Sequence, residues 1–153
     1  ETHHGKAYMK DKMYRIDVMD VVNYFDGEVI YTYMPDQEEV NIKNPEENED
    51  EMLNPSILFD IHNQKFTQKL VENKDGKAYI ELTPKQTHKQ ISKIGVWIDT
   101  KTNMVEKVTS FGKDGNDVVI TIKSLKKPEK ELDVTFFRFD KDAHPEVDVI
   151  DLR

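Results

Sequence analysis

The sequence predicts a mainly β protein, an unclosed antiparallel β-barrel of about ten strands with a helical lid. Three observations support this fold class. Asp26-Gly27, Asp75-Gly76 and Asp114-Gly115 each separate two apolar or β-branched segments, which is a strong hairpin signal. The segments between these turns alternate apolar and polar residues, as strands do. Residues 52–61 are the one stretch that follows the pattern of a helix start.

The predicted strands succeed one another as an antiparallel meander, with a further turn at residues 99–103. They cover residues 6–10, 13–19, 28–34, 38–43, 65–72, 77–83, 93–99, 104–111, 117–125, 133–139 and 147–150.

Several of these strands have one apolar face. Ala78, Ile80 and Leu82 point one way along their strand, and Ile94, Val96 and Ile98 do so along another. A single sheet of this size must twist and tends to curl, which gathers the apolar faces on its concave side. Such a sheet encloses either a cavity or a plug.

The exception among the strands is MLNPSILFDI, residues 52–61. Asn54 suits a helix N-cap and Pro55 suits the first helical position. Leu53 and Leu58 occupy the positions of a hydrophobic staple, and Ile57, Leu58 and Ile61 repeat at helical spacing. We expect this helix to cover the open mouth of the curved sheet.

Length and charge restrict the class of protein. A chain of 153 residues suits a single domain, residues 1–153. Its net charge of −8, with an acidic run at residues 44–51, argues against nucleic acid as a partner. The absence of cysteine excludes disulfides and thiol catalysis. No apolar stretch is long enough to span a membrane.

The residues that usually carry catalysis form no recognisable pattern. The five histidines lack metal-ligand spacing, no serine lies in a G-x-S-x-G turn, and no glycine-rich phosphate loop occurs. We therefore expect neither an enzyme nor a metal or cofactor. The many aromatic and methionine side chains on the strands leave two interpretations open, an ordinary packed core or a ligand cavity.

Short motifs follow one another in a fixed order along almost the whole chain. They are Gly5-Lys6-Ala7-Tyr8, Met13-Tyr14-Arg15-Ile16, Phe25-Asp26-Gly27, Tyr31-Thr32-Tyr33, Leu53-Asn54-Pro55, Leu82-Thr83-Pro84-Lys85, Phe137-Arg138-Phe139 and Pro145-Glu146-Val147-Asp148-Val149-Ile150-Asp151. In this order the motifs resemble the periplasmic outer-membrane lipoprotein carrier proteins, the LolA family. The chain ending is similar to that of a Bacteroidetes variant.

The resemblance implies an unclosed barrel with a helical lid over an apolar cavity. It implies a non-enzymatic periplasmic carrier for acylated lipoproteins. The partners would be those lipoproteins, an inner-membrane ABC transporter that releases them and an outer-membrane acceptor. Acyl chains would enter the concave face, where each buried methylene contributes about 0.8 kcal/mol.

The expected lipid contacts combine positions carried over from the family with the apolar strand faces. Tyr14 and Ile16 match cavity-facing positions, Tyr31 and Tyr33 follow the Asp26-Gly27 turn, and the helix supplies the lid. The complete predicted set is Tyr14, Ile16, Val18, Tyr31, Tyr33, Ile57, Leu58, Ile61, Ile80, Leu82, Ile94, Val96 and Ile98.

Two departures from the family pattern affect these expectations. The family commonly has an Arg-Pro step before the Tyr14 strand, whose arginine helps to hold the lid closed. Here the turn is Lys10-Asp11-Lys12, so any latch must be different or absent. We also expect the family's N-terminal helix and first strand to be missing from this sequence. Two alternatives stay open: a periplasmic lipid-binding or sensor protein on the same scaffold, and a packed β interaction domain without a lipid ligand.

Overall fold

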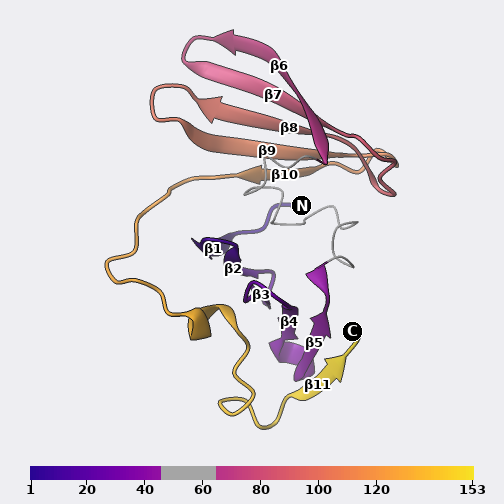
Figure 1. Cartoon of the computed structure of the whole chain (residues 1–153), viewed down its shortest axis with the longest axis vertical. Helices are drawn as coiled ribbons and strands as arrows, with labels where there is room; N and C mark the ends of the chain where they lie inside the picture. Colours follow the sequence, from indigo (N-terminus) through magenta and orange to yellow (C-terminus); the bar gives the residue numbers. More distant parts are fainter. Residues whose placement is uncertain (46–64) are drawn as a thin grey trace. The chain divides into compact units, whose positions relative to one another are not determined.

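The computed structural model describes residues 1–45 and 65–153. Its first sheet has six strands in the order β1-β2-β3-β4-β5-β11 (Figure 1). The strands are β1 (Gly5–Lys10), β2 (Met13–Val18), β3 (Val21–Phe25), β4 (Ile30–Met34), β5 (Glu39–Lys43) and β11 (Asp148–Asp151). Consecutive strands from β1 to β5 are antiparallel, whereas β11 pairs in parallel with β5. A 3-10 helix, η1 (Pro35–Gln37), joins β4 to β5.

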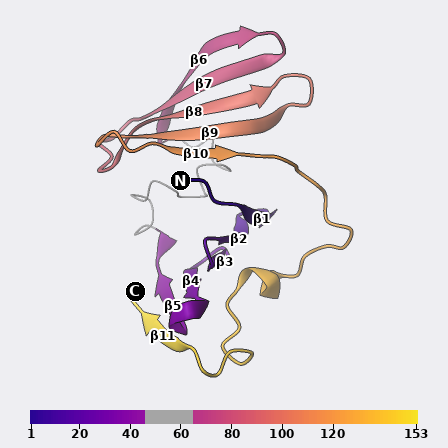
Figure 2. The ribbon, with the colours of Figure 1, turned by 180° about the vertical axis from the view of Figure 1, so that it is seen from behind.

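The second sheet has five antiparallel strands in the order β10-β9-β8-β7-β6 (Figure 2). They are β6 (Phe66–Lys74), β7 (Lys77–Pro84), β8 (Ile91–Asp99), β9 (Met104–Gly112) and β10 (Val118–Thr121). Gly76 (φ 77°) turns the chain from β6 to β7, and Gly115 (φ 84°) lies between β9 and β10. Glycine adopts such left-handed conformations readily, so the two Asp-Gly pairs in the sequence predicted both turns.

The chain divides into two compact units, which we describe separately. The outer unit combines Glu1–Glu49 with Pro128–Arg153, and the middle unit is the continuous segment Asp50–Lys127. Each unit has its own apolar cluster. In the middle unit it contains Leu82, Ile91, Ile94, Val96 and Val108, and in the outer unit it contains Tyr24, Val40, Phe139 and Val147.

The mainly β class and the unclosed architecture are confirmed, but the single antiparallel sheet is wrong. The described strands form two sheets, and neither sheet closes on itself. A continuous sheet would need β5 to pair with β6. Instead β11 lies beside β5, with Val149 opposite Val40 and Ile150 opposite Asn41, so that edge of β5 is already occupied.

The helical parts differ from expectation as well. Residues 133–139 form a 3-10 helix, η3 (Val134–Phe137), rather than a strand. The Asp133 carboxylate accepts hydrogen bonds from the backbone N–H and the hydroxyl of Thr135, and this local capping competes with strand pairing. The predicted lid, with Ile57, Leu58 and Ile61, lies outside the described residues. Within the described ranges no α-helix is present, and no helix could span a membrane.

Candidate functional site

One face of the middle sheet carries five of the predicted lipid contacts. Cross-strand pairing aligns Ile80 with Val96, and Leu82 with Ile94, on that face. Leu82 and Ile94 are fully buried, and Val96 is nearly so. Ile80 and Ile98 are partly buried and pack against this cluster. The centre of this apolar face is therefore buried, whereas Ile80 and Ile98 at its margin are partly accessible to solvent.

The opposite face of the same sheet carries an aromatic pair. Tyr79 and Trp97 lie opposite each other on β7 and β8, and their rings stack with centroids 4.5 Å apart. The Lys107 ammonium lies 3.7 Å from the Trp97 ring centroid, a cation–π contact. Gly95 lies beneath both rings, because a Cβ built there would come within 2.9 Å of each. The pair therefore covers a glycine that has no side chain of its own.

The hydroxyl of Tyr79 belongs to a charged network. It donates a hydrogen bond to the Glu81 carboxylate (3.0 Å), which also accepts one from the Lys93 ammonium (2.9 Å). Burial and the neighbouring carboxylate together raise the pKa of Tyr79 to about 12. The hydrogen bond from Lys93 is the largest cause that lowers the pKa of Glu81. This face is thus polar around its two rings.

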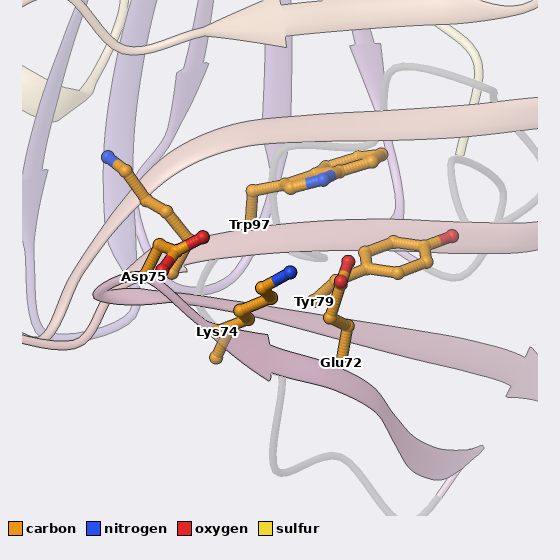
Figure 3. Close-up of a pocket in the computed structure, with 7 residues that line it drawn as sticks. Glu72, Lys74, Asp75, Tyr79 and Trp97 are labelled. Atoms are coloured by element: carbon orange, nitrogen blue, oxygen red, sulfur yellow. The ribbon is translucent and has the colours of Figure 1, made fainter.

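A pocket of about 320 Å³ opens beside the aromatic pair. Figure 3 shows Glu72, Lys74 and Asp75 around it, next to Tyr79 and Trp97. Charged groups of both signs line it, and burying an acyl chain there would remove water from those groups without replacing their hydrogen bonds. The pocket therefore does not suit an acyl chain.

In the outer unit, the predicted contacts do not share one face of the sheet. Arg15 lies opposite Tyr24, and Tyr24 lies opposite Tyr31, so these three residues share a face. Tyr14 precedes Arg15 and points to the other face, together with Ile16 and Val18. The structure thus separates Tyr14, Ile16 and Val18 from Tyr31 and Tyr33.

The face that holds Tyr31 and Tyr33 is covered by the chain between β10 and β11. Phe139 packs against Tyr33, with ring centroids 5.0 Å apart, and against Tyr24. Phe136 packs against Tyr8 at 5.1 Å. Protein side chains thus already occupy part of this face. Tyr14 is also buried (2% exposed), whereas Ile16 and Val18 are half-buried.

An ion pair fixes the covering segment to the β3–β4 turn. The Arg138 guanidinium donates a 2.8 Å hydrogen bond to Asp26, whose side chain is 1% exposed. Asp26 also accepts hydrogen bonds from the backbone N–H groups of Glu28 and Val29. Burial alone would raise the pKa of Asp26, but these hydrogen bonds and Arg138 together lower it. Two sequence motifs, Phe25-Asp26-Gly27 and Phe137-Arg138-Phe139, therefore meet at one contact.

Two contacts in this unit were missed by sequence reasoning. Lys10, the last residue of β1, donates a 2.9 Å hydrogen bond to the Leu132 carbonyl and pairs with Glu131. It therefore helps to hold the covering segment. Arg15 lies 4.9 Å from the Phe136 ring centroid, and alternation along β2 could have placed it on this face. Among the described residues, no group of acidic or histidine side chains could hold a metal ion.

Comparison with solved structures places this fold among known ones. The chain is similar to one chain of the complex between the CwlD amidase from Clostridioides difficile and the GerS lipoprotein. The TM-score is 0.51 at 14% identity, over 83% of this chain and 85% of that one. At this identity the likeness concerns the fold alone.

Sequence comparison identifies the family. The family described as outer membrane lipoprotein carrier protein LolA matches residues 20–140. The protein therefore belongs to the LolA family, as the order of its motifs predicts. No curated protein matches the sequence.

Proposed function

We propose that the protein binds the acyl chains of lipoproteins and carries them through the periplasm, from an inner-membrane transporter to an outer-membrane acceptor, without a catalytic step. The observation that carries this proposal is the apolar face of β7, β8 and β9 in a member of the LolA family. Its buried centre maintains the fold, and its partly buried margin offers contacts to an acyl chain.

The accessible margin also determines which residues a test should change. Ile80 and Ile98 are partly buried, so a charge there disturbs lipid contacts more than it disturbs the fold. Burying an isoleucine side chain contributes about 1.5–3 kcal/mol. We therefore expect Ile80→Asp and Ile98→Asp each to weaken binding of a fluorescent fatty acid roughly tenfold or more.

Val119→Asp is the matched control. Val119 is exposed and lies opposite Thr109, which lies opposite Gly95, so it belongs to the other face of the same sheet. We expect its fatty-acid affinity to equal that of the wild type. Equal losses in all three variants, or no fatty-acid binding by the wild type, would contradict the proposal and favour a packed interaction domain.

Carrier activity needs a separate experiment, because a lipid-binding sensor on this scaffold would also bind a fatty acid. The protein is added to spheroplasts, and the lipoprotein released into the medium is measured by pull-down and mass spectrometry. A carrier is expected to release acylated lipoprotein, and Ile80→Asp is expected to release less. Fatty-acid binding without lipoprotein release would indicate the sensor.

A further inference from the structure

The pocket of about 320 Å³ in the middle unit contains charged side chains that have no partner of opposite charge. Glu72, Lys74 and Asp75 line it, and all three are exposed. Among the residues that the structure describes, these three side chains form no ion pair. Lys77, which also lines the pocket, is by contrast paired with Glu106. The pocket therefore offers both a free carboxylate and a free ammonium to a ligand.

Strand pairing places two of these charges beside the aromatic pair. Glu72 lies opposite Tyr79 and Tyr79 lies opposite Trp97, so these three residues share a face of the sheet. Lys74 follows Glu72 by two positions on β6 and therefore shares that face. Figure 3 shows Lys74 extending toward Glu72 and the Tyr79 ring. An acidic group, a basic group and an aromatic ring thus border one concave space.

The Tyr79 ring is already held in place without a ligand. It stacks against Trp97, and its hydroxyl donates a hydrogen bond to Glu81. A ligand therefore loses little affinity to the ordering of this side chain. An aromatic ring beside a carboxylate attracts an ammonium group, through a cation–π contact and an ion pair. A lysine ammonium in turn binds phosphate as a point charge.

We propose that this pocket binds a phosphoethanolamine group, with the ammonium between Glu72 and the Tyr79 ring and the phosphate on Lys74. Alternate residues of a strand lie roughly 7 Å apart, so the acidic and basic groups are well separated. Phosphoethanolamine separates its charges by two carbons and an oxygen, whereas an α-amino acid carries both on one carbon. The pocket volume is also at the lower end of the range for small-molecule sites, which suits a compact polar group.

Trp97 provides a direct measurement, because it lines the pocket and is the only tryptophan in the chain. Titrating the full chain with O-phosphoethanolamine at low salt should change the Trp97 emission saturably, with a Kd in roughly the millimolar range. Ethanolamine and inorganic phosphate each carry one of the two charges, so their Kd values should be at least about threefold higher. No saturable change with phosphoethanolamine, or an equal Kd for either single-charge compound, would overturn the proposal.

Neutral variants test the two assigned contacts. Glu72→Gln and Lys74→Gln should each raise the Kd for phosphoethanolamine roughly three- to tenfold, because each removes one charged contact. Lys69→Gln, on the same strand but outside the pocket, and Glu129→Gln, outside the sheet, are matched controls at exposed positions. Both controls should leave the Kd unchanged. An unchanged Kd in either pocket variant, or an equal rise in the controls, would overturn the assignment.

Vesicles distinguish two sources of the same chemical group. Cosedimentation with vesicles of phosphatidylglycerol and phosphatidylethanolamine, but not with phosphatidylglycerol alone, would support a membrane lipid as the source. Binding of free phosphoethanolamine without any cosedimentation would support a soluble molecule that carries the group. Equal cosedimentation with both kinds of vesicle would contradict recognition of ethanolamine.

The phosphoethanolamine site is separate from the proposed acyl contacts. Ile80 follows Tyr79 on β7 and therefore points to the opposite face of the sheet. Ile80→Asp should leave the Kd for phosphoethanolamine unchanged, and Glu72→Gln should leave fatty-acid binding unchanged. Loss of fatty-acid binding alone would contradict the proposed function, whereas failure to bind phosphoethanolamine would contradict only this inference.

Discussion

The outer and middle units both place aromatic side chains on a sheet face, but they cover these faces in different ways. In the outer unit, Tyr24 and Tyr33 are covered by Phe139, which arrives from more than a hundred residues away along the chain. In the middle unit, Tyr79 and Trp97 are cross-strand neighbours that stack over Gly95. Tyrosines on a strand of this fold thus do not by themselves indicate a lipid cavity.

The largest expected effect comes from removing the centre of the covering segment. Phe137 is fully buried in η3, so Phe137→Ala removes a large buried side chain and leaves a cavity. We expect it to lower the free energy of unfolding by about 3–5 kcal/mol in urea titration. Val134→Ala, in the same 3-10 helix but 47% exposed, should change it by less than about 0.5 kcal/mol. Similar losses in both variants would show that the segment is not anchored by Phe137.

The Asp26–Arg138 pair gives the next largest effect. Arg138→Ala leaves the buried carboxylate without its cation, but the arginine side chain is 53% exposed and partly screened. We therefore expect a loss of about 1–2 kcal/mol in the free energy of unfolding. Arg153→Ala breaks an ion pair with Asp151 in which both side chains are substantially exposed, so we expect it to lower the free energy of unfolding clearly less than Arg138→Ala does. Equal losses in the Arg138→Ala and Arg153→Ala variants would mean that the burial of Asp26 does not strengthen its ion pair.

The same pair predicts the direction of an acid effect. The folded-state pKa of Asp26 is lowered, so its contribution to stability is fully present above the unfolded-state value of about 3.9. That contribution is lost as the pH falls through the lower folded-state pKa. Asp26→Asn should therefore be less stable than the wild type at neutral pH, and the difference should shrink as the pH falls below about 4. A difference that is constant with pH would contradict this assignment.

A smaller effect is expected in the middle unit, where the covering is local. Gly95→Ala places a Cβ against the rings of Trp97 and Tyr79, which must move to admit it. We expect a cost of about 1 kcal/mol and a changed emission spectrum from Trp97, the only tryptophan in the chain. Val119→Ala, on the same face but on the edge strand β10, should leave the emission unchanged. Unchanged emission in Gly95→Ala would show that the rings do not rest on Gly95.

The smallest expected effect is a gain in stability. Met19 and Asp20 join β2 to β3 with φ of 54° and 57°, a left-handed conformation that costs most side chains about 1–2 kcal/mol. Replacing them together by Asn and Gly supplies the residues that such a turn favours. We expect this double variant to gain about 0.5–1 kcal/mol in the free energy of unfolding. Met19→Ala keeps the unfavourable φ and should gain nothing.

The Met19-Asp20 turn also explains what sequence reasoning missed. Asp75-Gly76 carries the usual turn residues, so the β6–β7 hairpin was predicted. Met19-Asp20 carries no such signal, and β3 was therefore not predicted. Without β3, the sequence could not show that Arg15 lies opposite Tyr24 and that Tyr24 lies opposite Tyr31. Tyr14 and Tyr31 were therefore both predicted to contact lipid, although they point to opposite faces of the sheet.

Features that depend on local sequence patterns were predicted, whereas pairing between distant segments of the chain was not. Alternation in β7 and β8 correctly placed Ile80, Leu82, Ile94 and Val96 on one face, because side chains in a strand alternate. The motifs around Asp26 and Arg138 were recognised, but no spacing rule shows that residues 112 positions apart form an ion pair. The parallel pairing of β11 with β5 was missed for the same reason. The predicted lipid-binding role of Ile80, Leu82, Ile94 and Val96 stays a prediction.

The division of the chain has a consequence for the order of folding. The middle unit is continuous, whereas the outer unit needs residues from both ends of the sequence. During synthesis the strands β6 to β10 are therefore complete before Phe137, Arg138 and Phe139 leave the ribosome. Until they do, the tyrosines of β3 and β4 lack their cover and Asp26 lacks its cation. The outer unit therefore cannot complete its fold before the whole of the middle unit has been synthesised.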